Sequence, residues 1–207
     1  MKRIAIGMFL NCSSVKSVTL PESVEEIDTG AFARCENLKH LHIPGRISRI
    51  QRQAFINCRS LTEAPFAANA DIIGEEAFSG CTSLSALNLS DSVKEIGQSV
   101  FSGCSGLMEV TIPGSISVIP RESFSSCTGL AKVTIQDGVN AIDPAAFEEC
   151  LNLEHVTIPE SVSRIVQDTF SRCDKITIHA LSGSCAEKYA KENSIPFIAE
   201  VYTPRKS

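Results

Sequence analysis

Three ladders of similar residues run through this chain, and each repeats every 23 residues without an insertion or deletion. The first ladder is phenylalanine: Phe9, Phe32, Phe55, Phe78, Phe101, Phe124, Phe147 and Phe170. The second is cysteine, three positions later: Cys12, Cys35, Cys58, Cys81, Cys104, Cys127, Cys150 and Cys173. The third is aliphatic: Val15, Leu38, Leu61, Leu84, Leu107, Leu130, Leu153 and Ile176. A fixed period of roughly 20–50 residues indicates supersecondary units that stack on one another, so the sequence predicts a solenoid.

Composition narrows the class of protein and of partner. The unbroken period leaves no linker at which the 207 residues could divide into separate domains. Aromatic residues make up only 6% of the chain and tryptophan is absent, so we expect an aliphatic core with one phenylalanine per unit. The net charge of −5, without clustered lysine or arginine, argues against nucleic acid or an anionic membrane as a partner.

The first ten residues superficially resemble a signal peptide, because Lys2 and Arg3 precede an apolar run. However, Ile4 stands five residues before Phe9, as Ile27 stands before Phe32, so this segment already belongs to a repeat. No stretch approaches the roughly 18 apolar residues of a membrane span. We therefore expect neither a leader nor a span in this chain.

Eight of the nine cysteines occupy one equivalent position, and only Cys185 lies outside the ladder. A small buried slot of constant size in every coil favours free cysteine, which packs as a small hydrophobe. Disulfides are the less favoured interpretation, and a zinc site is less favoured still, because ligands on successive coils do not converge into a tetrahedron.

Each unit begins with a strand pattern that ends in a turn. In the second unit, Leu41 and Ile43 alternate with His40 and His42, and Pro44 then ends the strand. The apolar residues that follow are Ile47, Ile50, Ala54, Phe55, Cys58 and Leu61. Their spacing is typical of a helix. We therefore predict an α/β solenoid with a parallel sheet on its concave side and short helices or 3₁₀ turns on its convex side.

The repeated positions resemble a known family. The stretch from Leu38 through Leu41 to Ile43 is similar to the strand segment of leucine-rich repeats. The fuller string resembles the BspA-type leucine-rich repeat family, and it reads Pro21, Ser23, Val24, Ile27, Ala31, Phe32, Cys35 and Leu38. The resemblance implies a right-handed superhelix. It also implies a surface-exposed or secreted interaction module, often adhesive, that recognises proteins or other macromolecules and has no enzymatic activity.

We expect about eight repeats over residues 1–181, followed by a C-terminal capping helix and tail over residues 182–207. The helix is predicted from about Ser184 to Asn193, where Ala186, Tyr189 and Ala190 share one face. Such a cover is needed because the open end of a solenoid exposes core residues and a strand edge. Both ends are candidates for end-to-end self-association, the N-terminal one most of all because it has no evident polar cap.

The outward strand positions form the predicted binding surface on the concave face. The candidate binding residues are His40, His42, Glu63, Asn88, Glu109, Thr111, Lys132, Thr134, His155 and Thr157. Small polar side chains with a few charges are also typical of an ordinary solvated face. Because no aromatic anchor stands among them, a weak, extended or avid contact is favoured over a tight hot spot.

Two arrangements could carry other chemistry. His40, His42 and Glu63 resemble a two-histidine, one-carboxylate metal cluster, but such residues often meet by chance on an exposed sheet, and we predict no metal site. Cys185 stands six residues from His179 without an orienting acid, so packing in the closing helix is favoured over catalysis. We predict no enzyme activity and no cofactor.

The third unit deviates most, because Ala64 and Pro65 stand where other units place strand residues. We predict a local weak point there rather than a binding site. The leading functional hypothesis is an adhesin-like module that binds a protein or other macromolecule as part of a longer surface or secreted protein. The alternative is a structural spacer, for which a cytoplasmic location is open.

Overall fold

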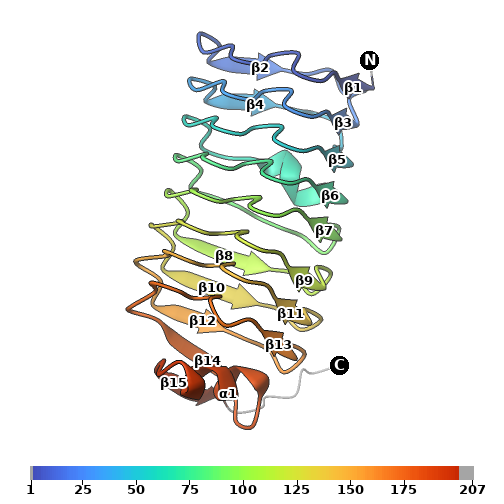
Figure 1. Ribbon diagram of the computed structural model, residues 1–207. Coiled ribbons are helices and arrows are strands. Elements are labelled where there is room, and N and C mark those ends of the chain that lie inside the picture. Colours follow the sequence, from blue (N-terminus) through green and yellow to red (C-terminus); the bar gives the residue numbers. More distant parts are fainter. Residues whose placement is uncertain (1, 201–207) are drawn as a thin grey trace.

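The computed structural model describes residues 2–200 as one stack of coils, with the chain passing down the stack from N-terminus to C-terminus (Figure 1). Most coils contribute a longer strand to one side, and each contributes a two-residue strand to the other. The longer strands are β2 (Ser17–Thr19), β4 (His40–His42), β8 (Glu109–Ile112), β10 (Lys132–Ile135), β12 (His155–Thr157) and β14 (Thr177–Leu181). The short strands are β1 (Arg3–Ile4), β3 (Glu26–Ile27), β5 (Arg49–Ile50), β6 (Ile72–Ile73), β7 (Glu95–Ile96), β9 (Val118–Ile119), β11 (Ala141–Ile142) and β13 (Arg164–Ile165).

Strand pairing follows the sequence period. All named pairs are parallel, and in the C-terminal half Val133 of β10 lies between Val110 of β8 and Val156 of β12. Alternate residues of these strands are buried and exposed, as a sheet with one solvated face requires. We call the outward side of β2, β4, β8, β10, β12 and β14 the strand face.

The three ladders lie in the core as continuous rows. Consecutive phenylalanine rings stack with centroids 4.9–5.5 Å apart and planes within 22° of parallel. The rings from Phe32 to Phe147 are fully buried, as are the cysteines from Cys35 to Cys150 and the leucines from Leu38 to Leu153. The predicted solenoid and its aliphatic core with one phenylalanine per unit are therefore confirmed.

The cysteine ladder has a polar role as well as a packing role. Each thiol from Cys35 to Cys173 donates to the backbone carbonyl of the phenylalanine in the preceding coil, at 3.0–3.2 Å between Sγ and O. All nine cysteines are free, as predicted. The slot therefore selects a side chain that is small, apolar and able to donate one weak hydrogen bond.

The convex-side helices predicted from the apolar spacing are not found in residues 2–200. That side is built from successive turns and the two-residue strands, and only η1 (Pro65–Asn69, a 3₁₀ helix) and α1 (Cys185–Glu192) are helical. The backbone bonds alternate within and between coils: the Ala31 N–H donates to Asp28 O, whereas the Phe32 N–H donates to Ala54 O at 2.8 Å. Turns can present the same apolar spacing as a helix here, because carbonyl groups of adjacent coils accept backbone hydrogen bonds that a helix would form within itself.

Positive φ angles explain why these segments cannot be helices. They occur two residues before and two residues after the phenylalanine position. The residues before it are Gly7, Gly30, Gln53, Glu76, Ser99, Glu122 and Ala145, and those after it are Asn11, Arg34, Asn57, Gly80, Gly103, Ser126, Glu149 and Arg172. A left-handed residue interrupts a right-handed helix, and it costs about 1–2 kcal/mol when the residue carries a Cβ.

Replacing Ala145 by glycine should stabilise the fold. Ala145 has φ 56°, a conformation that glycine adopts without the Cβ penalty. We expect Ala145→Gly to raise the free energy of unfolding by roughly 0.5–1 kcal/mol in urea titrations. The neighbouring Ala146, fully buried and without a positive φ, is the matched control, and Ala146→Gly should destabilise by a similar amount. A loss of stability in Ala145→Gly would contradict this account of the turns.

The pairing of the longer strands and the pairing of the two-residue strands are both interrupted at the same level of the stack. The strand-face sheet of the C-terminal half ends at β8, and the short-strand sheets end at β7 on one side and β9 on the other. We call this boundary, between residues 85–97 and residues 109–120, the seam. Pro120 contributes to the seam. It occupies the position that Gly97 and Asp143 hold in the neighbouring coils, where the backbone N–H donates to the preceding coil, and proline has no N–H to donate. The core continues through the seam, since the Phe101 N–H still donates to Ser123 O at 2.9 Å.

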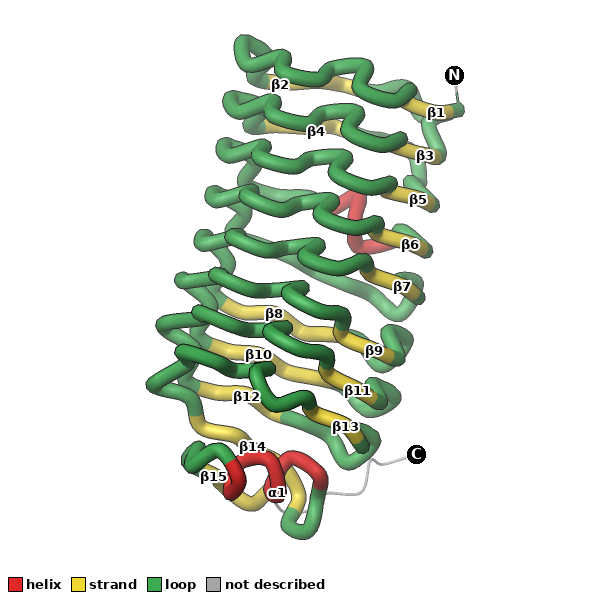
Figure 2. The backbone as a smooth tube through the Cα atoms, in the orientation of Figure 1, coloured by secondary structure: helices red, strands yellow, loops and turns green. Residues whose placement is uncertain are grey.

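The third unit departs from the repeat as the sequence indicated. Pro65 begins η1, and Phe66 enters the core with its ring centroid 5.3 Å from that of Phe55 and 6.3 Å from that of Phe78. Between β4 and β8 the strand face holds a single bridge, from Glu63 to Ala86. Figure 2 shows loop there instead of strand.

Amide hydrogen exchange should reveal this interruption as the weakest part of the stack. We expect amides in residues 64–69 and 86–89 to exchange faster than those of β10 and β12, because few inter-coil backbone bonds protect them. Equal protection in the two regions, measured by NMR under native conditions, would refute the prediction.

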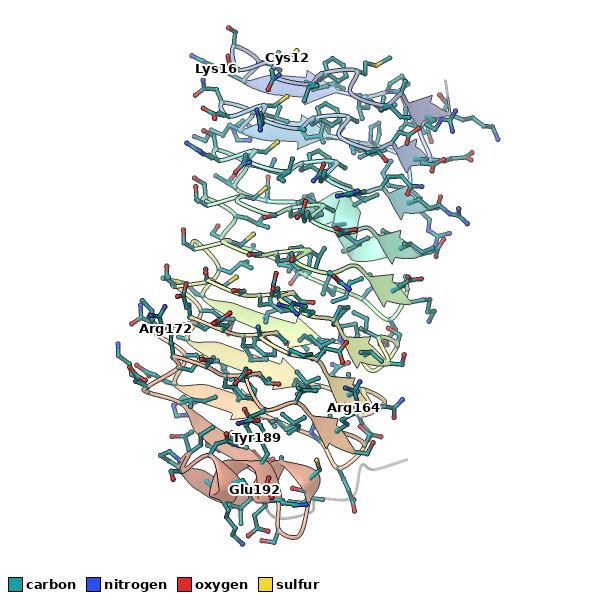
Figure 3. All side chains as sticks on the ribbon, in the orientation of Figure 1. Cys12, Lys16, Arg164, Arg172, Tyr189 and Glu192 are labelled. Atoms are coloured by element: carbon teal, nitrogen blue, oxygen red, sulfur yellow. The ribbon has the colours of Figure 1, made fainter. Side chains whose placement is uncertain are left out.

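The predicted terminal helix is present as α1, capped by the Ser184 side chain, which accepts from the Glu187 N–H. Its buried face consists of Ala186, Tyr189 and Ala190. Figure 3 shows Tyr189 directed at the last coil, where its hydroxyl donates to Gln167 O at 2.9 Å. Strand β15 (Phe197–Glu200) pairs with β14 and covers its edge. The predicted tail from residue 201 onward lies outside the described residues.

The N-terminal end of the described chain lacks such a cover. Ile6 is 72% exposed, and Met8 and Leu10 are about half exposed. End-to-end self-association stays a prediction.

Candidate functional site: the strand face

The strand face carries all ten candidate binding residues, at exposed or half-buried positions. The backbone of eight of them is held by inter-strand bonds in β4, β8, β10 and β12, and their side chains point outward from the buried residues of those strands. The other two, Glu63 and Asn88, lie in the interrupted stretch between β4 and β8. The register places Lys132 beside Glu109 on one side and His155 on the other. Most of the surface is therefore built on paired strands, which present their side chains in fixed columns.

A shallow hollow of about 290 Å³ lies on this face at the seam. Five of the ten predicted residues line it: Asn88, Glu109, Thr111, Lys132 and Thr134. Its floor includes Leu87, Leu89 and Val110. The hollow exists because segment 85–89 and β8 do not pair, which leaves the polar backbone groups of the edge strand β8 beside it. This feature could not be predicted from the 23-residue period, which places a paired strand there.

The two charged residues at the hollow differ from those turn-side charges that form ion pairs. Several turn-side charges pair between coils, as Arg52 does with Glu75 and Arg164 with Asp143. Within residues 2–200, neither Glu109 nor Lys132 takes part in an ion pair, although they are register neighbours. Both charged groups are therefore available to a partner.

The structure does not bring His40, His42 and Glu63 together as a group of metal ligands. No group of three or more metal-ligating side chains comes together in the part of the chain that the structure describes. Glu63 lies where the strand ladder is interrupted, and its bridge runs to Ala86 rather than toward β4. These three residues also lie outside the hollow.

One functional candidate was missed by the sequence analysis. His179 faces outward on β14, and its Nε2 lies 3.1 Å from Nδ1 of His155. A strict 23-residue register would make His179 equivalent to the buried Val156, but the observed register pairs it with Thr157. In this last unit the strand begins one residue earlier after the ladder position Ile176, and a shift of one residue turns every side chain of β14 to the opposite face. The signal in the sequence was that only one residue separates Ile176 from the next apolar strand residue, Ile178.

Comparison with known families decides the classification. The sequence profile described as "BspA type Leucine rich repeat region (6 copies)" matches residues 1–107 and 48–177. The chain belongs to the BspA-type leucine-rich repeat family. A comparison with curated proteins gives no match.

Solved structures support the same fold for this BspA-type domain. A leucine-rich repeat protein from Bacteroides ovatus aligns with a TM-score of 0.73 and 23% identity, over 97% of this chain and 55% of that protein. The T. pallidum leucine-rich repeat protein aligns at 0.66 and 25%, over 96% and 80%. A leucine rich cell surface protein from Faecalibacterium prausnitzii aligns at 0.57 and 21%, over 97% and 73%. The BspA-type domain thus spans about half the length of the B. ovatus protein.

Several buried thiols of the BspA-type domain are poorly suited to nucleophilic chemistry. Burial raises the pKa of Cys35 to about 11 and the pKa values of Cys81 and Cys127 to about 12. A neutral thiol is a weak nucleophile. Cys185 is half-buried at the start of α1, and the imidazole of His179 contacts His155 instead.

No helix among residues 2–200 is both long enough and apolar enough to cross a membrane.

Proposed function

We propose that this BspA-type domain is a non-catalytic binding module that recognises a protein through its strand face, centred on the hollow at the seam. The observation that carries the proposal is the availability of Glu109 and Lys132 beside the edge strand β8, which does not pair with segment 85–89. Opposite charges and free backbone groups suit an extended polypeptide segment, which can satisfy backbone donors and acceptors while its side chains meet the charges.

The wider setting belongs to the same proposal. The F. prausnitzii structure is of a protein described as a cell surface protein, and the BspA-type domain resembles it in fold. We therefore place the domain in a longer surface or secreted protein, where repetition and avidity would compensate for the lack of aromatic anchors. The spacer role is the competing hypothesis, and it needs no ligand.

Binding to immobilised extracellular-matrix proteins tests the proposal. We expect saturable binding of the wild-type domain to at least one of fibronectin, laminin and collagen in surface plasmon resonance. Glu109→Ala combined with Lys132→Ala should weaken it at least about tenfold, because both charges beside the hollow are lost. Arg52→Ala combined with Glu75→Ala removes an exposed turn-side ion pair and should leave binding unchanged.

Two results would contradict the proposal. Absence of saturable binding to all three matrix proteins would favour the spacer. Binding that the strand-face variant retains and the turn-side variant loses would move the interaction to the opposite side of the stack.

A further inference from the structure

Two of the four histidines meet on the strand face, near the C-terminal end of the stack. Nδ1 of His155 and Nε2 of His179 lie 3.1 Å apart, and the ring centroids are 5.2 Å apart with planes at 63°. The two residues come from β12 and β14, which lie side by side (Figure 1). His155 is exposed and His179 is half-buried, so solvent reaches the pair.

The backbone holds the two histidines in place. Strands β12 and β14 pair in parallel over three residues, and β14 is paired on its other side with β15. The residues directly opposite the histidines, Thr157 and Thr177, are small. The imidazoles are therefore fixed at their Cα atoms but free to turn about their side-chain torsions.

We propose that His155 and His179 form a two-histidine binding site for a late first-row divalent metal ion such as Zn²⁺. Two nitrogens bound to one Zn²⁺ at about 2.0–2.1 Å lie roughly 2.9–3.4 Å apart for bond angles between about 90° and 109°. The observed separation of 3.1 Å falls in that range. Neutral imidazole is a preferred ligand of Zn²⁺, Ni²⁺ and Cu²⁺.

Binding requires a change of tautomer and a rotation of the rings, because the two facing nitrogens of the free pair are directed at each other and must turn toward a common point. In the free pair one ring donates a hydrogen to the other, so one of the two facing nitrogens carries a proton. When both nitrogens bind the metal, that proton moves to the other nitrogen of the same ring. Both imidazoles stay neutral, and water fills the remaining positions of the ion.

Lys132 is the neighbouring charge that opposes a cation, because it pairs in register with His155 on β10. Lys132→Gln should therefore tighten metal binding several-fold. His40 and His42 provide an internal control, since they lie two residues apart on β4 and have no mutual contact between their rings.

Calorimetric titration of the tag-free protein with Zn²⁺, followed in parallel by NMR of the histidine ring protons, tests the site. We expect one equivalent of Zn²⁺ to bind and to shift the resonances of His155 and His179 while those of His40 and His42 stay in place. His155→Ala and His179→Ala should each lower the affinity at least about tenfold, because one of two protein ligands is lost. His40→Ala combined with His42→Ala, and separately Cys185→Ser, should bind as the wild type does.

Three results would overturn the site: no saturable binding, shifts confined to His40 and His42, or wild-type affinity in His179→Ala. Unchanged melting temperatures in the metal-free variants would show that the replacements act on metal binding and not on the fold.

Discussion

Replacing Phe124 by alanine should destabilise the protein by about 3–5 kcal/mol, the cost typical of emptying a fully buried aromatic position. The Phe124 ring is fully buried and stacks at 5.4 Å on the rings of both Phe101 and Phe147. Removing it opens a cavity in the middle of a continuous row, and the coils on both sides lose packing. Urea unfolding followed by circular dichroism measures the loss.

The end of the row supplies the matched control. Phe9 is only partly buried and stacks on Phe32 alone, at 4.9 Å. We expect Phe9→Ala to cost less than about 2 kcal/mol, because part of its surface is already in water. If the Phe124→Ala protein is too unstable to titrate, Phe124→Leu gives a smaller loss of the same sign. Equal losses in Phe9→Ala and Phe124→Ala would contradict the stacked core.

Raising the pH above about 9 should destabilise the protein far more than an ordinary soluble domain. Burial raises the pKa of Cys35 to about 11 and those of Cys81 and Cys127 to about 12, from an ordinary value of 9.0. Burial also raises the pKa values of Cys58 and Cys104. In the unfolded chain these thiols ionise first, so stability is complete below about pH 9 and is lost as the pH rises toward 11–12.

The expected slope is large because the thiols act together. Each buried thiol contributes up to about 1.4 kcal/mol of lost stability per pH unit in that range. Five of them can exhaust the typical 5–15 kcal/mol of a folded domain within about two pH units. Urea midpoints measured from pH 8 to 10.5 under reducing conditions should therefore fall steeply.

Removing thiols should flatten that dependence. The variant Cys81→Ala combined with Cys127→Ala loses two titrating groups and should show a slope smaller by up to about 2.7 kcal/mol per pH unit. It should also be less stable than the wild type at pH 7, because two S–H bonds to phenylalanine carbonyls are gone. A urea midpoint that stays constant between pH 8 and 10.5 would show that the ladder thiols are not buried.

Much of the fold could be predicted from the 23-residue period, because the period records which side chains share a row. The equivalents of Phe55 and Cys58 are buried in every coil from Phe32 to Cys173, since the stack gives each of them similar neighbours. The exposed positions of Glu109 and Lys132 followed from the alternation of the strand.

The features that could not be predicted arise where side-chain spacing does not determine backbone geometry. The apolar spacing from Ala54 to Leu61 fits a helix and a run of turns equally well, and the positive φ of residues such as Gln53 and Asn57 decides between them. The hollow depends on the seam, where Pro120 and the displaced unit around Phe66 break pairing that the period implies. The pair of His155 and His179 depends on a register change of one residue.

A double-mutant cycle on Phe101 and Phe124 tests the central claim, that the ladder side chains of successive coils stack directly on one another. Phe101→Leu and Phe124→Leu, singly and together, should show a coupling free energy of at least about 0.5 kcal/mol, because their rings stack at 5.4 Å. The same cycle on Phe55 and Phe124, three coils apart, should be additive within about 0.5 kcal/mol. Additivity in the Phe101 and Phe124 cycle, or equal coupling in both cycles, would contradict the stacked solenoid.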